Sequence, residues 1–468
     1  MPNFIETYHC RTGIVNEKSF STSSLDELEL ALQRSTDAYE SGALLDIHVR
    51  TLFLNELHEQ ISRRKEDLFF IYESESSLSR SRFDIEFDRT LNQLKQYRDA
   101  AIALHDHTTT SIIAERTLIK RALPLGPVAI FGASNFPLAY STLGGDVMGA
   151  FASGCPVLVK GHPFHAGTSL LSAEIIHQTL LELNLHPGIF GHLLDDGYGI
   201  GRALVEDERI KGCGFTGSYE GGMTLFRAAQ NRKNPIPFFA EMGSLNPVII
   251  LPDAEHLSLH SSALIDSITA DAGQFCTKPG IIFCPSNLIN EALIHLNNGF
   301  YAALSHPMLH PTILTRYLKR IKEIQSLNIG REYLVQHQAF NVPRGFFHLQ
   351  YNELNDYETL RQEVFGPSCL LVEYQNEEQL VFTLNKLQGQ LTTTLIGKNP
   401  ENSALFSLAC SLSGRVILNG VPTGVSVVPA MHHGGPIPAS SDARFSAVGE
   451  ASILRFIRYA TVQKSHGN

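Results

Sequence analysis

Hydrophobic residues recur with two different periods along this 468-residue chain. From Ser24 to about His105 apolar side chains return every three or four residues, notably over 25–38 and 48–71, which predicts amphipathic helices. We expect the charged residues on these helices to form solvated faces. Beyond this layer, short apolar runs that end at glycine or proline alternate with stretches compatible with helix. The change of period predicts a helical layer followed by α/β structure.

The short apolar runs are the expected strands. Because strands that alternate with helices form βαβ units, we expect two regions of parallel sheet, divided near Glu241. Ligands bind such sheets at the carboxyl ends of the strands. The runs before the division are 128–131, 156–160, 189–194 and 210–215, and those after it include 248–251, 281–284, 369–372 and 415–418.

Two further segments have the pattern of extended chain. Residues 108–123 predict two short strands, and the β-branched and aromatic residues of 453–462 predict a terminal strand. A terminal strand needs a partner for its backbone, and another subunit could supply it.

Composition excludes several classes of function. The formal net charge is −10, with 47 acidic and 37 basic residues and no long basic run, so we expect no nucleic-acid binding. Seven widely spaced cysteines without a C-x-x-C pair predict neither a disulfide framework nor a zinc site, and they favour a reducing compartment. No apolar run is long enough to span a membrane, and the polar N-terminus lacks a signal-peptide pattern. We therefore expect a cytoplasmic protein. The run His105-Asp106-His107 is not expected to bind a metal, because three adjacent side chains on one helix do not converge.

Cys276 is the first candidate for chemistry. It lies in the segment 271–280 among small and flexible residues, with Gly273 in a position that allows close approach of a substrate. A thiol becomes a strong nucleophile once it loses its proton. For an isolated cysteine, the alternative is a buried thiol that acts as a small hydrophobe.

Three more polar residues could take part in catalysis. Asn135 follows the run 128–131 and could offer an amide to a developing oxyanion, or form a turn before Pro137. Glu241 follows an apolar run and could be a partly desolvated general base, or an acid that faces water. His433 lies beside His432 in a glycine loop, where at most one imidazole faces the site, and a structural histidine is the alternative.

Other positions suit a bound cofactor. Lys160 ends a strand, where its ammonium could bind ribose hydroxyls or simply reach solvent. The motif Phe215-Thr216-Gly217-Ser218 opens a helix whose N-terminal amides could meet a phosphate, although it is not the G-x-G-x-x-G fingerprint. Glu363 and Phe365 lie beside a turn, where a surface acid and a core aromatic are the alternative.

Taken in order, these motifs resemble the aldehyde dehydrogenase superfamily over roughly residues 20–463. The set is Asn135-Phe136-Pro137, Lys160, Phe215-Thr216-Gly217-Ser218, Glu241-Met242-Gly243, Gly273-Gln274-Phe275-Cys276 and Glu363-Val364-Phe365-Gly366-Pro367. More narrowly, four segments are similar to the α-ketoglutarate semialdehyde (2,5-dioxopentanoate) dehydrogenase branch, which neighbours a bacterial fatty aldehyde dehydrogenase. These segments are 131–137, 159–163, 273–277 and 433–436.

The resemblance implies an α/β fold with three parts. A doubly wound, Rossmann-type cofactor domain would comprise residues 1–106 and 124–242, and a second α/β domain, for catalysis, would comprise 243–430. Residues 107–123 and 450–463 would form a small β oligomerisation arm, so we expect a homodimer or homotetramer.

The resemblance also implies roles. Cys276 would attack the aldehyde, the Asn135 amide and the Cys276 N–H would hold the oxyanion, and Glu241 would activate the water that hydrolyses the thioester. The remaining roles concern the cofactor: Lys160 would bind the adenosine ribose, Ser218 the pyrophosphate and Glu363 the nicotinamide ribose, with Phe365, Phe215, Thr216, Gly217, His162 and Pro163 nearby.

Two departures from the family's pattern change the expectations. Many relatives have a glutamate three residues after the lysine, which repels a 2′-phosphate, whereas this chain has Pro163, so NADP is expected to be preferred and NAD accepted. Many also have a lysine nine residues after the asparagine, where this chain has Gly144. Our hypothesis is that His433 takes over some of the proton handling near Cys276.

The expected reaction is the NAD(P)-dependent oxidation of a small aldehyde to its acid, through a cysteine thiohemiacetal and thioester, with α-ketoglutarate semialdehyde as the first choice of substrate. The alternatives are a medium- or long-chain aliphatic aldehyde, a cysteine hydrolase that uses Cys276 with His433, and a non-catalytic scaffold. An arginine near the substrate would favour the dicarboxylate, but the sequence does not place Arg121, Arg361 or Arg444 in space.

Overall fold

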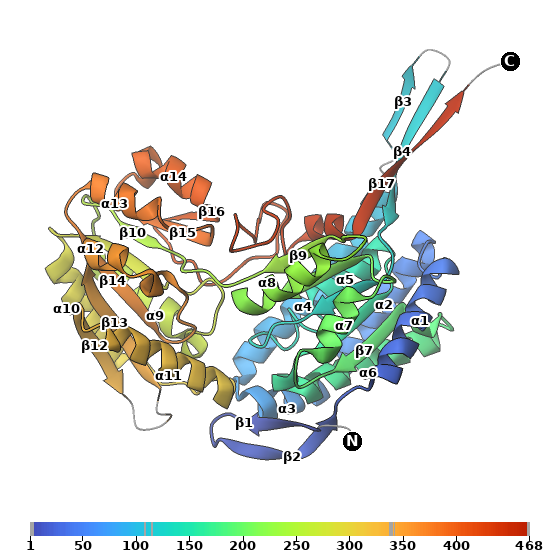
Figure 1. The fold of residues 1–468 in the computed structure, drawn as a ribbon, viewed down its shortest axis with the longest axis horizontal. Helices are drawn as coiled ribbons and strands as arrows, with labels where there is room; N and C mark the ends of the chain where they lie inside the picture. The colour runs from blue at the N-terminus through green and yellow to red at the C-terminus, as the bar shows by residue number, and fades with distance from the viewer. Residues whose placement is uncertain (1–3, 107–108, 114–115, 337–339, 341, 466–468) are drawn as a thin grey trace.

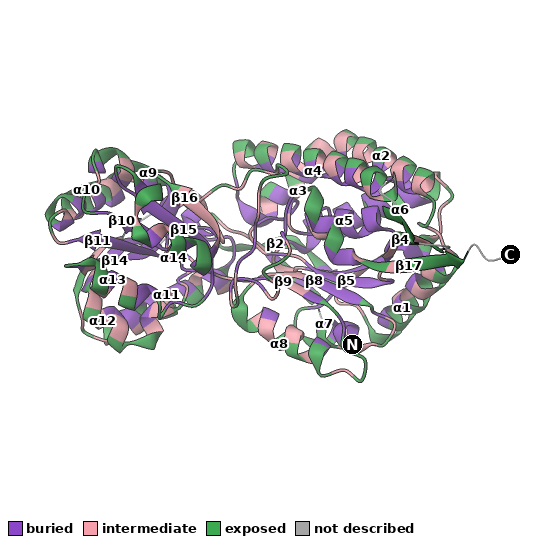
Figure 2. Ribbon diagram, turned by 90° about the horizontal axis from the view of Figure 1, so that it is seen from above, coloured by how far each residue is buried: buried purple, intermediate pink, exposed green. Residues whose placement is uncertain are grey.

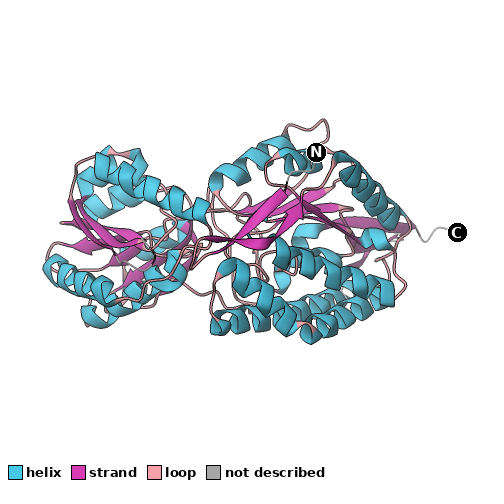
Figure 3. Ribbon diagram, turned by 90° about the horizontal axis from the view of Figure 1, so that it is seen from below, coloured by secondary structure: helices cyan, strands magenta, loops and turns pink. Residues whose placement is uncertain are grey.

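The computed structural model describes residues 4–106, 109–113, 116–336, 340 and 342–465. It shows two lobes, each built around a sheet, with a narrow three-stranded arm that projects from the first lobe (Figure 1). Helices lie on both sides of the sheets (Figure 3), so the chain has the expected α/β class. An N-terminal hairpin of β1 (Phe4–His9) and β2 (Ile14–Ser21) was not foreseen.

The sheet of the first lobe has the strand order β7-β6-β5-β8-β9, and all its neighbouring pairs are parallel. This is the doubly wound order, in which the direction of winding reverses beside the first strand and leaves a crevice for ligands. Every residue of β5 is buried, as expected for a parallel strand covered on both faces. The strands are β5 (Val128–Phe131), β6 (Val157–Gly161), β7 (Phe190–Leu194), β8 (Gly212–Thr216) and β9 (Phe238–Glu241).

The helices of this lobe cover both faces of the sheet. Helix α1 contacts β6, β7 and α7, whereas α2 contacts α4, α5 and α6. The run 48–71, read as one helical stretch, forms two helices that are divided at Arg64. The helices are α1 (Leu25–Glu40), α2 (Ile47–Arg63), α3 (Lys65–Ser76), α4 (Arg80–Asp106), α5 (Gly145–Ser153), α6 (Ala166–Glu182), α7 (Gly199–Glu206) and α8 (Tyr219–Gln230), with short 3-10 helices η1 (Pro163–His165) and η2 (Pro187–Ile189).

The second lobe contains a sheet of order β12-β13-β14-β11-β10-β15-β16, in which β12 is antiparallel to β13 and the other described pairs are parallel. Its inner strands are mostly buried, the edge strands β12 and β16 are partly exposed, and its helices are exposed on their outer faces (Figure 2). The strands are β10 (Val248–Ile250), β11 (Ile281–Pro285), β12 (Arg331–Gln336), β13 (Pro343–Gln350), β14 (Ser368–Tyr374), β15 (Gln390–Ile396) and β16 (Ser413–Leu418). The helices are α9 (Leu257–Thr269), α10 (Ile289–Ala302), α11 (Pro311–Ser326), α12 (Tyr351–Asp356), α13 (Glu377–Leu384) and α14 (Ala404–Leu412), with η3 (Ala270–Gly273), η4 (Glu358–Arg361) and η5 (Pro400–Asn402).

The arm consists of β3 (Thr109–Ile113), β4 (Arg116–Pro124) and β17 (Ile457–Ser465), in the order β17-β4-β3. Within the chain, the terminal strand β17 already pairs with β4 along its whole length and forms one edge of the arm, so pairing with another subunit stays a prediction for its outer edge. The strand also starts later than expected: residues 450–456 form the 3-10 helix η6 (Glu450–Phe456), which packs on α5 and buries Phe456 completely. Residues 107–108 and 114–115 of the expected arm, including His107, lie outside the described residues.

None of the helices in the described part of the chain is both long enough and apolar enough to cross a membrane.

Candidate active site

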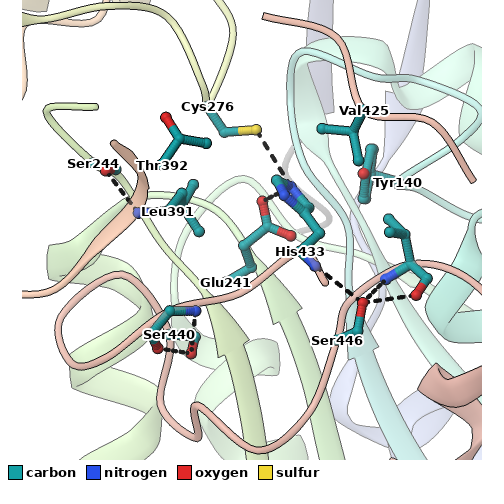
Figure 4. Close-up of polar contacts among 12 residues, drawn as sticks. Tyr140, Glu241, Ser244, Cys276, Leu391, Thr392, Val425, His433, Ser440 and Ser446 are labelled. Carbon is teal, nitrogen blue, oxygen red and sulfur yellow. Dashed lines mark hydrogen bonds and ion pairs between the residues drawn. The ribbon is translucent and has the colours of Figure 1, made fainter. Parts of the chain in front are cut away.

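Residues from both lobes meet at the carboxyl edge of the first sheet. Glu241 is the last residue of β9, and Asn135 follows β5. Cys276 comes from the second lobe, three residues beyond η3, and His433 comes from the long loop between β16 and η6. Figure 4 shows the side chains of Cys276, His433 and Glu241 pointing toward one another.

The three side chains form a continuous polar array. The distance from Cys276 Sγ to His433 Nε2 is 3.7 Å, and that from His433 Nε2 to Glu241 Oε1 is 2.7 Å. The imidazole is buried, and its backbone N–H donates to Ser446 Oγ. Of the two adjacent histidines His433 is therefore the one that faces Cys276. Its Nε2 atom can exchange a proton with either neighbour, because it lies within reach of both.

Burial and charge keep the thiol protonated at rest. Burial raises the pKa of Cys276 well above its usual value, and the nearby negative charges of Glu241 and Glu363 raise it further. Arg89 acts in the opposite direction, and its effect on the Cys276 pKa is weaker. A thiol in this state attacks a carbonyl only when a base removes its proton, and His433 is in place to do so.

The loop that carries Cys276 is fixed by Asn246, which the sequence did not single out. Its buried Nδ2 donates to the carbonyls of Cys276 (2.7 Å) and Lys278 (3.0 Å), and its Oδ1 accepts from Thr392 Oγ1 (3.0 Å). Asn246 has a φ of 48°, a left-handed conformation that asparagine tolerates better than most residues. The signal available in the sequence was an asparagine directly before a proline and an apolar run.

Asn135 lies against the same loop. Its Nδ2 donates to the Gln274 carbonyl (2.8 Å), and the rings of its neighbour Phe136 and of Phe275 meet edge to face at 5.6 Å. An amide nitrogen carries two hydrogens, so one remains for another acceptor. This position is compatible with the predicted role of Asn135 in binding the oxyanion, and that role stays a prediction.

The expectation that the charges on the N-terminal helices are solvated was wrong for part of α4. Arg82 is mostly buried, pairs with Glu86 (2.9 Å) and Asp271 (2.8 Å), and lies 4.4 Å from the ring centre of Phe136. Glu86 Oε1 also accepts the backbone N–H groups of residues 138 and 139. These charges are paired across elements far apart in sequence, so they stiffen the loops around Asn135 and Cys276.

The expected cofactor residues of the first lobe line the ends of β6 and β8. Lys160 Nζ donates to the carbonyl of Asp195 (3.0 Å), and burial lowers its pKa. Ser218 is the N-cap of α8, and its Oγ accepts the N–H of Gly221. Three other members of the set, Phe215, Thr216 and Gly217, lead from β8 into that cap. His162 and Pro163 begin η1, where His162 Nδ1 accepts from Phe164 N–H.

Glu363 and Phe365 belong to the second lobe. The Glu363 carboxylate faces Gly243, and burial raises its pKa to about 7 against the opposing charge of Lys278. Burial likewise lowers the pKa of Lys278 to about 8, and Lys278 Nζ donates to the carbonyls of Val364 and Ser368. Phe365 packs on the hydrophobic core. The side chain of Glu363 is thus directed into the protein.

This arrangement fits a dinucleotide. Lys160 has a main-chain carbonyl as its hydrogen-bond partner and keeps further N–H groups for hydroxyls, while the cap of α8 presents backbone N–H groups near the crevice of a doubly wound sheet.

A model of the aldehyde dehydrogenase family matches residues 16–436.

The chain belongs to the aldehyde dehydrogenase family. It is therefore an NAD(P)-dependent oxidoreductase that acts on aldehydes.

Individual relatives agree with this assignment. The chain is 36% identical over 465 residues to an α-ketoglutaric semialdehyde dehydrogenase of Acinetobacter baylyi, covering 95% of this chain and 88% of the relative. It is 33% identical to α-ketoglutaric semialdehyde dehydrogenase 2 of Azospirillum brasilense, covering 94% and 87%. The fold is similar to that of a 1-pyrroline-5-carboxylate dehydrogenase from Thermus with bound NAD, with a TM-score of 0.87, 18% identity and coverage of 99% and 90%.

Proposed function

We propose that this aldehyde dehydrogenase oxidises α-ketoglutarate semialdehyde to α-ketoglutarate, with NADP preferred and NAD accepted. The contact of His433 Nε2 with both Cys276 Sγ and Glu241 Oε1 carries the proposal for the chemistry. The names of two relatives that are 36% and 33% identical over nearly the whole chain support the choice of substrate.

The first step forms a bond between Cys276 Sγ and the aldehyde carbon. In its Nδ1–H tautomer, His433 accepts the thiol proton at Nε2, and the imidazolium can donate that proton to Glu241 Oε1 at 2.7 Å. The aldehyde oxygen becomes an oxyanion, which the Asn135 amide and the backbone N–H of Cys276 stabilise.

NAD(P), held by Lys160, Ser218 and Glu363, would supply the two-electron acceptor for the hydride of the thiohemiacetal, and a thioester would then remain on Cys276. Glu241, after its proton has left, takes a proton from water, and the hydroxide oxygen adds to the thioester carbon. The carbon–sulfur bond then breaks and the acid leaves. In balance, aldehyde, water and oxidised cofactor yield acid, reduced cofactor and a proton.

The proposed cofactor contacts are Lys160 to the adenosine ribose, Ser218 to the pyrophosphate and Glu363 to the nicotinamide ribose. Preference for NADP rests on Pro163, which places no carboxylate at that position. The charges of Asp195 and Asp196 act on Lys160 and raise its pKa, in opposition to the effect of burial.

We assign cofactor binding to residues 1–106 and 124–242, catalysis to 243–430, and assembly of a homodimer or homotetramer to the arm. On β3, Ile112 and Ile113 are 74% and 60% exposed, and such apolar edge strands favour association. All seven cysteines are free, which supports a cytoplasmic location.

An aldehyde panel assayed with NAD and with NADP tests the proposal. The expected result is the highest kcat/KM for α-ketoglutarate semialdehyde, with NADP bound more tightly than NAD. A higher kcat/KM for medium- or long-chain aliphatic aldehydes would contradict the substrate, and NAD binding at least as tight as that of NADP would contradict the cofactor preference.

A further inference from the structure

Two arginines beside the active site have no ion-pair partner in the described part of the chain. Arg89 lies on α4 and Arg415 on β16, and both are half-buried. The Nε atom of each is buried without a hydrogen-bond partner. They differ from the arginines that the sequence left unplaced. Arg121 lies on the arm, Arg361 donates to carbonyls of α12, and Arg444 is paired with Asp442.

Arg89 reaches the catalytic array through Tyr140. Its Nη2 donates to the Tyr140 hydroxyl at 2.6 Å and its Nη1 to the Val425 carbonyl at 3.2 Å. The Tyr140 ring lies 6.4 Å, centre to centre, from the ring of His433. Figure 4 shows Tyr140 and Val425 on the side of His433 that is away from Glu241.

Arg415 approaches the same place from the second lobe. Its Nη1 donates to the Gly424 carbonyl at 2.8 Å and its Nη2 to the Pro422 carbonyl. The segment 422–425 therefore lies between two guanidinium groups that come from different lobes. Burial lowers the pKa of Arg415, while the charges of Cys276 and Tyr140 act against this shift.

The two charges are not balanced by the acids of the site. The Glu241 carboxylate already contacts His433, and Glu363 faces Gly243 and Lys278. A half-buried guanidinium without a carboxylate partner is costly unless another anion approaches it. The hydrogen bonds of the two arginines run from their Nη atoms to neutral acceptors, so neither positive charge is neutralised and both buried Nε–H groups lack a partner in the described part of the chain.

We propose that Arg89 and Arg415 bind the far carboxylate of the substrate, at the end of the molecule opposite the aldehyde. The site would select aldehydes with a second, anionic end, because a guanidinium matches the two oxygens of a carboxylate. This inference rests on the proposed function and identifies the residues that would give it its substrate class.

A purely structural role, in which the arginines only fix the loop, does not explain why both side chains carry a charge. Gln96 lies about two turns beyond Arg89 on α4. Its uncharged side chain also holds this loop, because Nε2 donates to the Val427 carbonyl at 2.9 Å. A neutral side chain thus anchors the same loop two residues beyond Val425. Gln96 also provides the control, because its removal loosens the same loop and leaves both guanidinium groups in place.

The test compares α-ketoglutarate semialdehyde with pentanal, an aldehyde of equal chain length that lacks the carboxylate. In Arg89→Met and Arg415→Met, kcat/KM for the semialdehyde should fall roughly 10- to 100-fold, the size expected for a hydrogen bond to a charged group, and mainly through KM. For pentanal the fall in kcat/KM should be at least about 10-fold smaller, because the effect of the lost charge on Cys276 is common to both aldehydes and only the semialdehyde also loses a carboxylate contact. Gln96→Met should affect both aldehydes equally.

An equal loss for both aldehydes in the arginine variants would overturn the proposed carboxylate site and leave the proposed function intact. A wild-type enzyme that oxidises pentanal as well as the semialdehyde would instead overturn the proposed substrate, and the site with it. Calorimetric titration with α-ketoglutarate, the expected product, requires no turnover. If an arginine variant is inactive, unchanged affinity for this dicarboxylate would also refute the site.

Discussion

Asn246 provides a quantitative test of how the nucleophile loop is held. Replacing it by alanine removes the donor to the Cys276 and Lys278 carbonyls and leaves the Thr392 hydroxyl without its acceptor. Residue 246 is 0% exposed, so water does not replace these partners. Each lost bond costs about 1 kcal/mol, which gives about 3 kcal/mol for the side chain. Alanine at a φ of 48° adds about 1 kcal/mol, for a total of about 4 kcal/mol.

The exposed Asn328 supplies the control for the backbone contribution. It has nearly the same conformation, with a φ of 51°, and its side chain makes only a long bond of 3.4 Å to the Ser326 carbonyl. Asn328→Ala should therefore cost about 1 kcal/mol. Comparing the two variants isolates the hydrogen bonds to the loop.

Urea unfolding followed by circular dichroism measures the two losses, and kcat measures the effect on the nucleophile. We expect Asn246→Ala to lower the free energy of unfolding by about 3 kcal/mol more than Asn328→Ala, and to lower kcat while the NADP dissociation constant stays the same. Similar losses of stability in both variants would refute the reasoning, since the carbonyl contacts would then contribute nothing.

Two further predictions concern protons at the site. In a Cys410→Ser background, which removes an exposed thiol, His433→Asn should slow alkylation of Cys276 near neutral pH by about 100-fold or more and shift its profile to higher pH; an unchanged profile would show that His433 is not the base. Burial raises the pKa of Glu363 from 4.5 to about 7, so the folded protein retains a proton that the unfolded chain releases, and stability should fall as the pH rises through this interval. Glu363→Gln should remove this slope in urea unfolding, and an equal slope in both proteins would contradict the pKa.

Most of the regular structure could be read from local pattern. The continuous apolar run 128–131 is typical of a parallel strand buried on both faces, and it forms β5. The end of the chain was harder, because residues 453–456 carry the same residue types as a strand. Phe456 is drawn into the core beside α5 instead, and this packing replaces the local preference for strand.

The candidate site was only partly accessible from the sequence. Cys276, Glu241 and His433 could be named because a nucleophile, an acid and an imidazole in small-residue loops are visible locally. The charged residues of α4 were misread, since their spacing resembles a solvated face. Arg82 and Arg89 have partners that are 189 and 336 residues away, and no local pattern encodes such pairs.

By itself, the sequence determined the family, the alternation of strands and helices, and the order of the motifs, because each depends on residues close together in the chain. Only the tertiary structure decided that His433 Nε2 lies between the thiol and the carboxylate, that β17 pairs with β4 of the same chain, and that two arginines near the site have no ion-pair partner among the described residues. These features depend on where distant segments meet, and burial in the folded protein then sets the cost of every charge placed there.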